Sequence, residues 1–426
     1  MRVLVVGAGA REHVLVDKIS QNTSISVIYA APGNAGISEL AQCVDIAAED
    51  IEGLADFATK KAIDLTVVGP EAPLVDGIVD LFYTRGIRVF GPDKQAARLE
   101  GSKSFAKKLM LDYGIPTAKG MAFSDHESTI EHIRDTVVPF VVKADGLAAG
   151  KGVTVCFDKE TAKGVIQECF VDEKFGEAGK TVIIEEYLEG QEVTVMAFTD
   201  GETVLPMLPA QDHKPVFDQD KGPNTGGMGA YSPVPAISGD LYKEIVDRFL
   251  KPTVDALRTE GVIYRGILYA GLILTKEGPK ILEFNCRFGD PEAQVVLPLL
   301  KTDLMELILA TTEGNLKDYK LKWQNRVAVS VVLASKGYPG AYKKGHEIKG
   351  LDAAGNLPDI KVYHAGTAKK DSRTVTSGGR VLNVVGFGDD HLSARFVAYE
   401  GIKQIEFEGM HYRTDIAEKA ITVSSD

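Results

Sequence analysis

The chain has 426 residues, of which 44% are hydrophobic and 25% are charged, and its formal net charge is -12. This composition is typical of a globular protein, and the length exceeds one ordinary core, so roughly two to four domains are expected. The acidic balance argues against a general binder of nucleic acid or membrane surfaces, so any phosphate chemistry must be local.

The four cysteines are widely scattered, and neither they nor the eight histidines have the spacing of a zinc site. No apolar run approaches the length of a membrane span or of a signal-peptide core. We therefore expect a cytoplasmic protein with reduced thiols that binds neither nucleic acid nor membrane.

The first hundred residues alternate short apolar segments with helical stretches, which predicts a parallel sheet covered by helices. The expected strands are Arg2 to Val6, Val27 to Ala30, Leu65 to Val68 and Arg88 to Phe90. Ligands of such sheets bind at the carboxyl ends of the strands. Three loops follow these ends, namely Gly7 to Glu12, Pro32 to Gly36 and Gly69 to Pro73.

The first of these loops does not match a dinucleotide fingerprint. Glu12 stands where the third glycine of GxGxxG would be, and the second strand ends in Tyr29 to Pro32, without an acid for a ribose hydroxyl. A smaller phosphorylated ligand, cradled by Gly9 and the amino end of the following helix, fits better. The alternative, that these glycines only allow tight turns, is equally compatible with the local sequence.

A strand, a glycine loop and a second strand are expected between Phe140 and Val155. The loop is not a Walker A motif, because its first two glycines enclose three residues rather than four and a strand follows. It can instead fold over a nucleotide as a flap, with Lys151 approaching the phosphates and Lys143 rising from the strand beneath. An ordinary hairpin with an exposed lysine is the alternative.

Two further segments suit a nucleotide and a charged substrate. The expected strand Val182 to Glu186 is followed by Tyr187 and Leu188, whose free backbone can pair with an adenine edge, while Glu192 can accept from ribose hydroxyls. The segment Gly222 to Pro233 is rich in glycine, which predicts a mobile loop that closes over a substrate. A flexible linker is the alternative, although the polar residues just before the loop favour a site.

The segment Ile281 to Cys286 is expected to be a strand, on which side chains two apart share a face. Glu283, Asn285 and Arg287 would then project together. A carboxylate beside an amide oxygen suits Mg²⁺, which commonly binds through one or two protein oxygens and substrate phosphates. Arg287 would donate to phosphoryl oxygens. For so short a motif in isolation, a solvated charge pair at a strand edge is the favoured alternative.

Asp290 and Pro291 predict the start of a helix, with Asp290 as N-cap and Pro291 at the first helical position. This helix is expected to run towards Leu300 with a kink at Pro298. From about Val327 the chain has short strands and no catalytic set of its own. We interpret that part as a packing domain that also walls the cleft.

Together these motifs resemble those of ATP-grasp ligases, and in particular the phosphoribosylamine-glycine ligase family. The resemblance rests on VGAGAREH, APGNAG, VGPEAPL, KADGLAAGKGV, QDHK, GPNTGGMGAYSP and EFNCRFGDPEAQ, and GYPG, HAGT and SGGRV extend it to nearly the whole chain. RFGDPE after EFN and NTGGMGAYSP are highly specific, whereas single glycine motifs are not.

The resemblance implies a mixed α/β and α+β multidomain fold. Residues 1–102 would form a parallel, Rossmann-like preATP-grasp domain, residues 103–326 an ATP-grasp domain whose glycine-rich flap subdomain spans 123–187, and residues 327–426 a small β-rich domain. The implied reaction joins glycine to 5-phosphoribosylamine with ATP, through glycyl phosphate, with Mg²⁺ or Mn²⁺ as cofactor. These small molecules are the expected partners, and a monomer is expected, with a weak homodimer as the alternative.

Residue by residue, the resemblance implies four groups of roles. Catalytic roles are implied for Arg287, Lys143 and Asp212. Contacts with ATP are implied for Lys103, Lys143, Gly150, Lys151, Gly152, Glu185, Glu186, Tyr187, Leu188, Glu192 and Asn285. Contacts with the other substrates are implied for Gly9, Arg11, Glu12, Asn34, Glu71, Asp212, Lys214, Gly226, Gly227, Met228, Gly229 and Arg287. Metal ligation is implied for Glu283 and Asn285.

The sequence departs from the family pattern at Ala10, where glycine is common, and at Pro215, where a basic residue is common. The first change is conservative, and the second puts one substrate or nucleotide contact in doubt.

Three other interpretations of the function stay open. The first is a sister ATP-grasp ligase or carboxylase, which its substrate dependence would distinguish. The second is an NAD oxidoreductase, against which Glu12 argues. The third is a non-catalytic ATP-binding regulator, against which the complete set of metal ligands and arginine argues.

Overall fold

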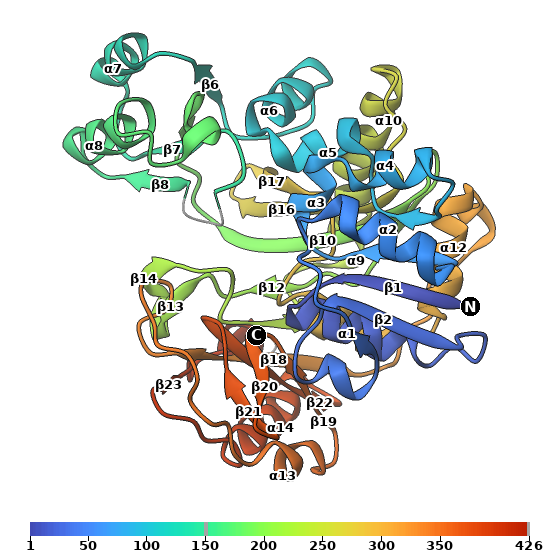
Figure 1. The fold of residues 1–426 in the computed structure, drawn as a ribbon. Helices are drawn as coiled ribbons and strands as arrows, with labels where there is room; N and C mark the ends of the chain where they lie inside the picture. The colour runs from blue at the N-terminus through green and yellow to red at the C-terminus, as the bar shows by residue number, and fades with distance from the viewer. Residues whose placement is uncertain (149–151, 424–426) are drawn as a thin grey trace.

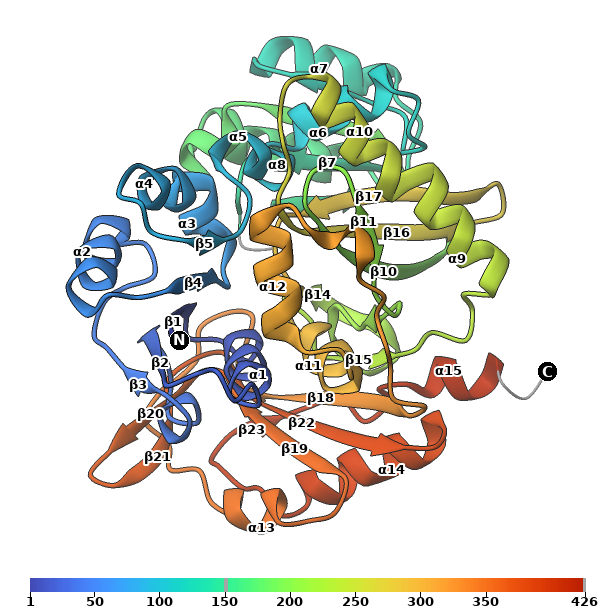
Figure 2. The same ribbon diagram turned by 90° about the vertical axis from the view of Figure 1, so that its right-hand side faces the viewer.

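The structure is a computed structural model that describes residues 1–148 and 152–423, and the side chains up to residue 421. Gly150 and Lys151, two of the predicted ATP contacts, lie outside the described residues. Gly152 comes directly after this segment, and its carbonyl accepts the N–H of Ala144 at 2.8 Å. Figures 1 and 2 show an N-terminal α/β region, a central sheet, a projecting lobe and a C-terminal region. The predicted mixed, multidomain fold is confirmed.

The N-terminal region is a five-stranded parallel sheet in the order β3-β2-β1-β4-β5. Along β1, Val3 and Val5 join one hydrophobic cluster while Leu4 and Val6 join another, so both faces of the sheet are covered, as parallel sheets require. The elements are β1 (Arg2–Gly7), α1 (Ala10–Ile19), β2 (Val27–Pro32), β3 (Gln42–Cys43), α2 (Ile51–Lys61), β4 (Leu65–Val68), α3 (Glu71–Asp76), α4 (Ile78–Thr84), β5 (Val89–Phe90) and α5 (Lys94–Gly101).

A lobe formed by residues 120–186 projects from the rest of the molecule (Figure 1). Its antiparallel sheet has the order β6-β9-β7-β8, and its own hydrophobic core includes Phe140, Ile166 and Ile184. Helix α6 (Lys103–Asp112) leads into it, and its elements are β6 (Gly120–Phe123), α7 (His126–Asp135), β7 (Phe140–Ala144), β8 (Val153–Cys156), α8 (Lys159–Phe170) and β9 (Val182–Glu186).

The central sheet is antiparallel, in the order β11-β10-β16-β17. Its strands are β10 (Gln191–Thr199), β11 (Val204–Pro206), β16 (Gly266–Thr275) and β17 (Gly278–Asn285), and the helices of this part are α9 (Gly239–Ile245), α10 (Lys251–Thr259), α11 (Ala293–Val296) and α12 (Leu304–Glu313). A π-helical turn, η4 (Val246–Leu250), joins α9 to α10.

The C-terminal region contains a sheet in the order β12-β15-β18-β22-β19, with β23 beside β18. The strands of this sheet are β12 (Gln211–Asp212), β15 (Gly229–Ser232), β18 (Val327–Ser335), β19 (Ile360–His364), β22 (Arg380–Gly388) and β23 (Met410–His411). Two separate hairpins pair β13 (Pro215–Phe217) with β14 (Lys221–Asn224) and β20 (Thr367–Lys370) with β21 (Arg373–Thr376). The helices of the region are α13 (Leu351–Gly355), α14 (His391–Ile402) and α15 (Glu418–Val423). Because β12 and β15 join this sheet, the polar segment and the glycine loop of the middle region are anchored to the C-terminal region.

Candidate active site

The two predicted metal ligands lie on β17, the last strand of the central sheet. Glu283 is paired with Gly271 and Asn285 with Tyr269 on the neighbouring strand. Both side chains are partly exposed, whereas Phe284 between them is buried. A side chain at position 271 would start 3.2 Å from Glu283 Cγ, so the glycine leaves room for the carboxylate. The two side chains project from one face, as expected, and their metal-binding role stays a prediction.

Glu283 lies in a strongly positive environment. Within the described residues its carboxylate makes no side-chain hydrogen bond or ion pair. Burial would raise the pKa of Glu283, but the charges of Lys214, Lys143, Lys103 and Arg287 outweigh it and lower the pKa. The carboxylate is therefore ionised at neutral pH, with its lone pairs free for a hard cation.

Arg287 follows the end of β17 and is held between two carboxylates. Its Nε donates to Glu71 Oε2 at 3.0 Å and its Nη2 to Glu100 Oε1 at 3.0 Å. Nη2 also lies 3.4 Å from Asn285 Oδ1, which links the arginine to the predicted metal ligands. Burial would raise the pKa of Glu71, but Arg287 and Arg11 lower it to about 2. The guanidinium is thus fixed beside the strand end by ionic hydrogen bonds.

Glu100 is a part of this site that the sequence analysis missed. It lies near the end of α5, and its Oε2 accepts the backbone N–H of Cys286 at 2.7 Å. Its side chain is 6% exposed. Glu100 therefore fixes both Arg287 and the backbone that carries it. The surrounding sequence, Arg-Leu-Glu-Gly, has no motif, so only the tertiary fold reveals this contact.

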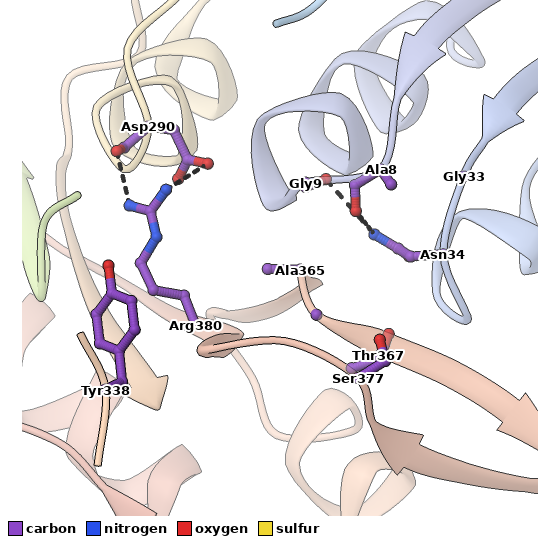
Figure 3. Close-up of a pocket in the computed structure, with 11 residues that line it drawn as sticks. Ala8, Gly9, Gly33, Asn34, Asp290, Tyr338, Ala365, Thr367, Ser377 and Arg380 are labelled. Atoms are coloured by element: carbon purple, nitrogen blue, oxygen red, sulfur yellow. Dashed lines mark hydrogen bonds and ion pairs between the residues drawn. The ribbon is translucent and has the colours of Figure 1, made fainter. Parts of the chain in front are cut away.

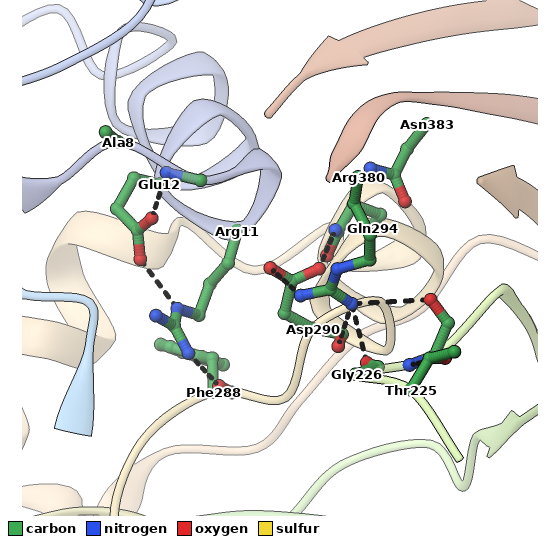
Figure 4. Close-up of polar contacts among 12 residues, drawn as sticks. Ala8, Arg11, Glu12, Thr225, Gly226, Phe288, Asp290, Gln294, Arg380 and Asn383 are labelled. Carbon is green, nitrogen blue, oxygen red and sulfur yellow. Dashed lines mark hydrogen bonds and ion pairs between the residues drawn. The ribbon is translucent and has the colours of Figure 1, made fainter. Parts of the chain in front are cut away.

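Glu12 occupies the amino end of α1 (Figure 4). Its Oε2 accepts the N–H of Gly9 at 2.6 Å and its Oε1 accepts Arg11 Nε at 2.6 Å. Arg11 also donates to the carbonyl of Phe288 at 3.2 Å and lies 4.0 Å from Glu71. The chain's own carboxylate therefore satisfies the Gly9 N–H and would repel a second anion, and the phosphate cradle at Gly9 stays a prediction.

Asn34 lies at the same edge of the sheet, but backbone groups use both ends of its amide. Nδ2 donates to the carbonyls of Ala8 at 2.9 Å and His364 at 2.8 Å. Oδ1 accepts the N–H groups of Gly36 at 3.0 Å and Ile37 at 2.9 Å. Asn34 thus ties the loop after β2 to β1 and to the C-terminal region, and a side-chain contact with substrate would have to break one of these bonds.

Glu185, a predicted ATP contact, is occupied by two lysines. Its carboxylate pairs with Lys143 at 2.6 Å and with Lys107 at 2.8 Å, and its side chain is 7% exposed. Lys143 also donates to the carbonyl of Leu282 at 3.1 Å, next to Glu283. Glu185 is therefore better placed to position Lys143 than to contact a nucleotide.

Lys103, on α6, is like Lys143 a predicted contact of the ATP phosphates. Its Nζ donates to the carbonyls of Gly146 at 2.9 Å and Asp145 at 3.4 Å. No ion pair of Lys103 occurs among the residues that the structure describes. Burial lowers the pKa of this lysine, and Glu283 is the strongest charge that opposes the decrease.

The predicted adenine segment leaves its sheet after Glu186. The N–H of Glu186 donates to the carbonyl of Lys119 at 2.8 Å, and its carboxylate accepts the N–H of Lys119 at 2.9 Å. Tyr187 and Leu188 follow beyond the end of β9, with half-buried side chains. Glu192, on β10, pairs with Lys214. The strand end has the expected form, and its contact with ATP stays a prediction.

Asp212 lies at the end of β12 among other carboxylates. Burial raises its pKa, Lys214 opposes the increase, and Glu292, Glu192 and Glu283 reinforce it, so that the pKa reaches about 7. Lys214 remains charged, because Asp212, Glu192 and Glu283 outweigh its burial and raise its pKa. A carboxyl group that titrates near neutral pH suits a proton acceptor.

The glycine loop before β15 is hydrogen-bonded to the C-terminal region, and its closure over a substrate stays a prediction. The N–H of Gly226 donates to the hydroxyl of Tyr338 at 3.1 Å, and its carbonyl accepts Arg380 Nη1 at 2.6 Å (Figure 4). A side chain at Gly227 would collide with Pro291, so these residues pass close to the segment after β17. Residues 227–229 are buried. The loop is a fixed wall of the site in this structure.

Asp290 does not begin a helix, which corrects the expectation of an N-cap at this position. Helix α11 begins at Ala293, and the Asp290 carboxylate instead pairs with Arg380 at 3.0 Å (Figure 3). The ion pair overrides the local capping signal, because a guanidinium offers a stronger partner than helix N–H groups. After Val296 the helical course continues as a 3₁₀ turn, η5 (Leu297–Leu299), so the predicted run towards Leu300 with a change at Pro298 is confirmed.

The arrangement combines an ionised carboxylate, an anchored arginine, several lysines and a carboxyl group whose pKa is raised to about 7. Cations of this kind neutralise phosphoryl oxygens. Across the described residues, no group of three or more His, Cys, Asp and Glu side chains could hold a metal ion. A cation at Glu283 and Asn285 would therefore need further oxygens from a substrate, as Mg²⁺ commonly does.

Comparisons with protein-family models cover nearly the whole chain. Residues 1–100 match the N domain of phosphoribosylglycinamide synthetase, residues 101–293 match its ATP-grasp (A) domain, and residues 328–419 match its C domain.

Individual relatives give the same result. The phosphoribosylamine–glycine ligase of Caldanaerobacter subterraneus subsp. tengcongensis is 54% identical over 417 residues, which are 98% of this chain and 99% of the relative. The trifunctional purine biosynthetic protein adenosine-3 of Homo sapiens is 51% identical over 424 residues, which are 99% of this chain but 42% of that protein.

Solved structures agree at the level of the fold. The crystal structure of phosphoribosylamine–glycine ligase from Thermotoga maritima has a TM-score of 0.85 and 36% identity, and the match covers 97% of this chain and 100% of that one. The biotin carboxylase domain of the Hydrogenobacter thermophilus 2-oxoglutarate carboxylase has a TM-score of 0.75 at 16% identity, and covers 99% of this chain and 98% of that one. The second likeness concerns the fold alone.

Proposed function

Because this chain belongs to the phosphoribosylglycinamide synthetase family, we propose that it joins glycine to 5-phosphoribosylamine with ATP, giving glycinamide ribonucleotide, ADP and phosphate. The observation that carries the proposal is the corner at the end of β17. There an ionised Glu283, which has no ion-pair partner among the described residues, lies beside Asn285 and an anchored Arg287. These residues can neutralise the negative charge of the phosphoryl group during its transfer, which is the main requirement of the reaction.

The chemistry proceeds in two steps. A carboxylate is a poor acyl donor, so one glycine carboxylate oxygen first attacks the γ-phosphorus of ATP, and the bond to the ADP oxygen breaks. The amine of phosphoribosylamine then attacks the carbonyl carbon of glycyl phosphate, the C–O bond to phosphate breaks, and the nitrogen loses a proton. Most of the catalysis comes from positioning the reactants and stabilising the phosphoryl charge.

Residues of this chain are suited to bind the phosphates, to stabilise the transferring group and to accept the proton. Lys103 and Lys143 would approach the ATP phosphates, and Arg287 would donate to the transferring group, fixed in place by its carboxylate partners. Asp212 would accept the proton that the amine loses, since its pKa of about 7 allows it to hold that proton at neutral pH. Lys214 beside it would neutralise the carboxylate of glycine.

The residues also fit a divalent cation. Glu283 offers carboxylate lone pairs that no described side chain uses, and the amide oxygen of Asn285 projects from the same face. These are hard oxygen donors of the type that Mg²⁺ or Mn²⁺ prefers, and together with phosphate oxygens they would hold it. When bound, the cation supplies positive charge to the phosphate oxygens.

The decisive experiment is an omission assay on the purified protein. Phosphate release from ATP is measured with glycine and phosphoribosylamine together, and with each omitted in turn. We expect turnover only with both. Equal release with another acceptor, or with bicarbonate in place of glycine, would assign the chain to another ATP-grasp carboxylate–amine ligase or carboxylase, which is the alternative function.

Among the described residues no helix is both long and apolar enough to cross a membrane. Cytoplasmic location and a monomeric state are still predictions, and gel filtration with light scattering would test the second.

A further inference from the structure

Two predicted contacts of the ATP phosphates come from different parts of the molecule. Lys103 is the first residue of α6, whereas Lys143 lies on β7 in the projecting lobe (Figure 1). One phosphate chain can contact both lysines only if the lobe and the helix keep a fixed relative position. We propose that Asp145 is the positioning residue that sets this relative position, by joining the end of β7 to the amino end of α6. The inference rests on the proposed function, and it assigns a role to a residue outside the predicted ATP contacts.

The carboxylate of Asp145 caps the amino end of α6 from a distant part of the chain. Oδ1 accepts the N–H of Ser104 at 2.5 Å, and Oδ2 accepts the hydroxyls of Ser104 at 3.0 Å and Ser102 at 3.1 Å. The carbonyl of Asp145 accepts the N–H of Lys103 at 3.0 Å. N–H groups at a helix start lack intrahelical partners, and a carboxylate there also interacts favourably with the helix dipole. The local N-cap, Ser102, accepts the N–H of Phe105, and Asp145, 41 positions from Ser104, supplies the other acceptors.

Asp145 is anchored equally well on the side of the lobe. Its N–H donates to the carbonyls of Ala178 and Thr181, at 3.0 Å each. Ala144, the preceding residue, pairs with Val182 on β9. The backbone of Asp145 therefore belongs to the hydrogen-bonded framework of the lobe, while its side chain holds α6. Supporting contacts of this kind fix the geometry of the residues that bind a ligand.

Both lysines depend on the segment that Asp145 ties to the helix. Lys103 Nζ donates to the carbonyl of Gly146 at 2.9 Å and lies 3.4 Å from the carbonyl of Asp145, so this side chain follows the backbone after β7. Lys143 lies two residues before Asp145 on the same backbone, and Glu185 pairs with it at 2.6 Å. A shift of the lobe relative to α6 would therefore change the separation of the two ammonium groups.

The junction between α5 and α6 also supports the residues at the end of β17. Glu100, near the end of α5, accepts Arg287 Nη2 at 3.0 Å and the N–H of Cys286 at 2.7 Å. The two serines that hold Asp145 follow within four residues. Residues 100–104 thus connect the lobe to the end of β17. The lysines that would bind the ATP phosphates and the arginine that would meet the transferring group share this support.

The test measures binding of an ATP analogue to the Asp145→Ala protein. We expect the Kd for the non-hydrolysable analogue AMP-PNP with Mg²⁺, measured by calorimetry, to rise about 10-fold or more, because displaced lysines lose ionic hydrogen bonds to the phosphates. The Kd for adenosine, measured by competition, should change less than about 2-fold, because adenosine has no phosphates. Loss of a negative charge near the phosphates would by itself tighten binding, so weaker binding reports the loss of position.

Asp125→Ala is the matched control. Asp125 caps α7 inside the lobe with the same chemistry, since it accepts the N–H of Ser128 at 2.8 Å and the hydroxyl of Ser128 at 2.5 Å. Both partners belong to the helix that Asp125 precedes, so its loss should lower Tm without changing the Kd for AMP-PNP. Asp145→Asn keeps an oxygen that can accept the N–H of Ser104, and it should restore most of the affinity for AMP-PNP.

Unchanged or tighter binding of AMP-PNP by Asp145→Ala would overturn the proposal, as would equal losses of affinity for AMP-PNP and adenosine. Ser104→Ala, which removes one hydroxyl partner of Asp145 and leaves every charge in place, should weaken AMP-PNP binding in the same direction. This second variant keeps the test available if Asp145→Ala does not fold. Failure of the proposed function is a separate outcome, in which the unmodified protein binds AMP-PNP but releases no phosphate from ATP with glycine and phosphoribosylamine.

Discussion

The raised pKa of Asp212 makes a quantitative prediction about stability. A carboxyl group whose pKa rises on folding binds more protons in the folded state than in the unfolded state, so stability decreases as pH rises through the interval between the two values. For Asp212 the interval runs from 3.8 to about 7. Asp212→Asn removes the ionisation and should therefore stabilise the protein at pH 8 and have little effect below pH 4.

The magnitude follows from the same two values. The change from 3.8 to about 7 corresponds to an upper limit of roughly 4 kcal/mol. Because the side chain is partly exposed and solvent screens its neighbours, we expect about 2 kcal/mol at pH 8. With an unfolding entropy of about 2.1 cal/mol/K per residue over 426 residues, this equals an increase in Tm of about 2 °C.

Thermal unfolding at pH 4, 6 and 8, with EDTA and without substrates, measures the effect. Asp389→Asn, at an exposed position, serves as the matched control and should leave Tm unchanged at every pH. The reasoning would be refuted by a Tm difference for Asp212→Asn that is the same at all three pH values, or by destabilisation at pH 8. The variant should also lose turnover, since it cannot accept a proton, so higher stability and lower activity should occur together.

Three further variants test the charged residues around the end of β17. Glu283→Gln should reduce kcat at least 100-fold with Tm within 1 °C of the parent, and near-normal turnover with Mg²⁺ would contradict its assignment as a metal ligand. Glu100→Gln should lower kcat by roughly 10- to 150-fold, because an ionic hydrogen bond of about 1.5–3 kcal/mol no longer fixes Arg287; KM for ATP should change less than kcat, and a pure KM effect would contradict the positioning role. Glu185→Gln removes the counter-charge of two buried lysines, one of which is Lys143. The protein should therefore be destabilised by about 3–5 kcal/mol, measured as a lower Tm. An unchanged Tm would show that the lysines find other partners.

Local pattern was sufficient for the strands and for the shared face of Glu283 and Asn285. Alternation along β17 placed Glu283 and Asn285 together, because side-chain direction in a strand depends only on spacing. The buried strands of the N-terminal sheet were predicted from apolar runs between turn residues, which are also local signals.

Long-range contacts account for what the sequence did not predict. Glu100 is 187 positions from Arg287, and no spacing rule connects them. Asp290 has the residue type and context of an N-cap, yet Arg380, 90 positions later, takes its carboxylate. The glycine loop before β15 is likewise fixed by Tyr338 and Arg380 from the C-terminal region. For Asp290, the tertiary ion pair outweighs a local capping preference that is worth about 1 kcal/mol.

The distribution of paired and unpaired charges indicates how the site is prepared for its substrates. Lys143 has Glu185, Arg287 has Glu71 and Glu100, and Lys214 has Glu192, so these cations are positioned before any phosphate arrives. Lys103 and Glu283 differ, since neither has an ion-pair partner in the described parts of the chain. One is a cation that needs an anion, and the other is an anion that needs a cation. In the proposed complex, ATP would supply phosphate oxygens to Lys103, and a divalent cation would supply positive charge to Glu283, so both groups would gain their missing partners from one ligand. Binding should therefore depend on both together, and the double variant Lys103→Met/Glu283→Gln should bind ATP more tightly than the sum of the two single effects predicts.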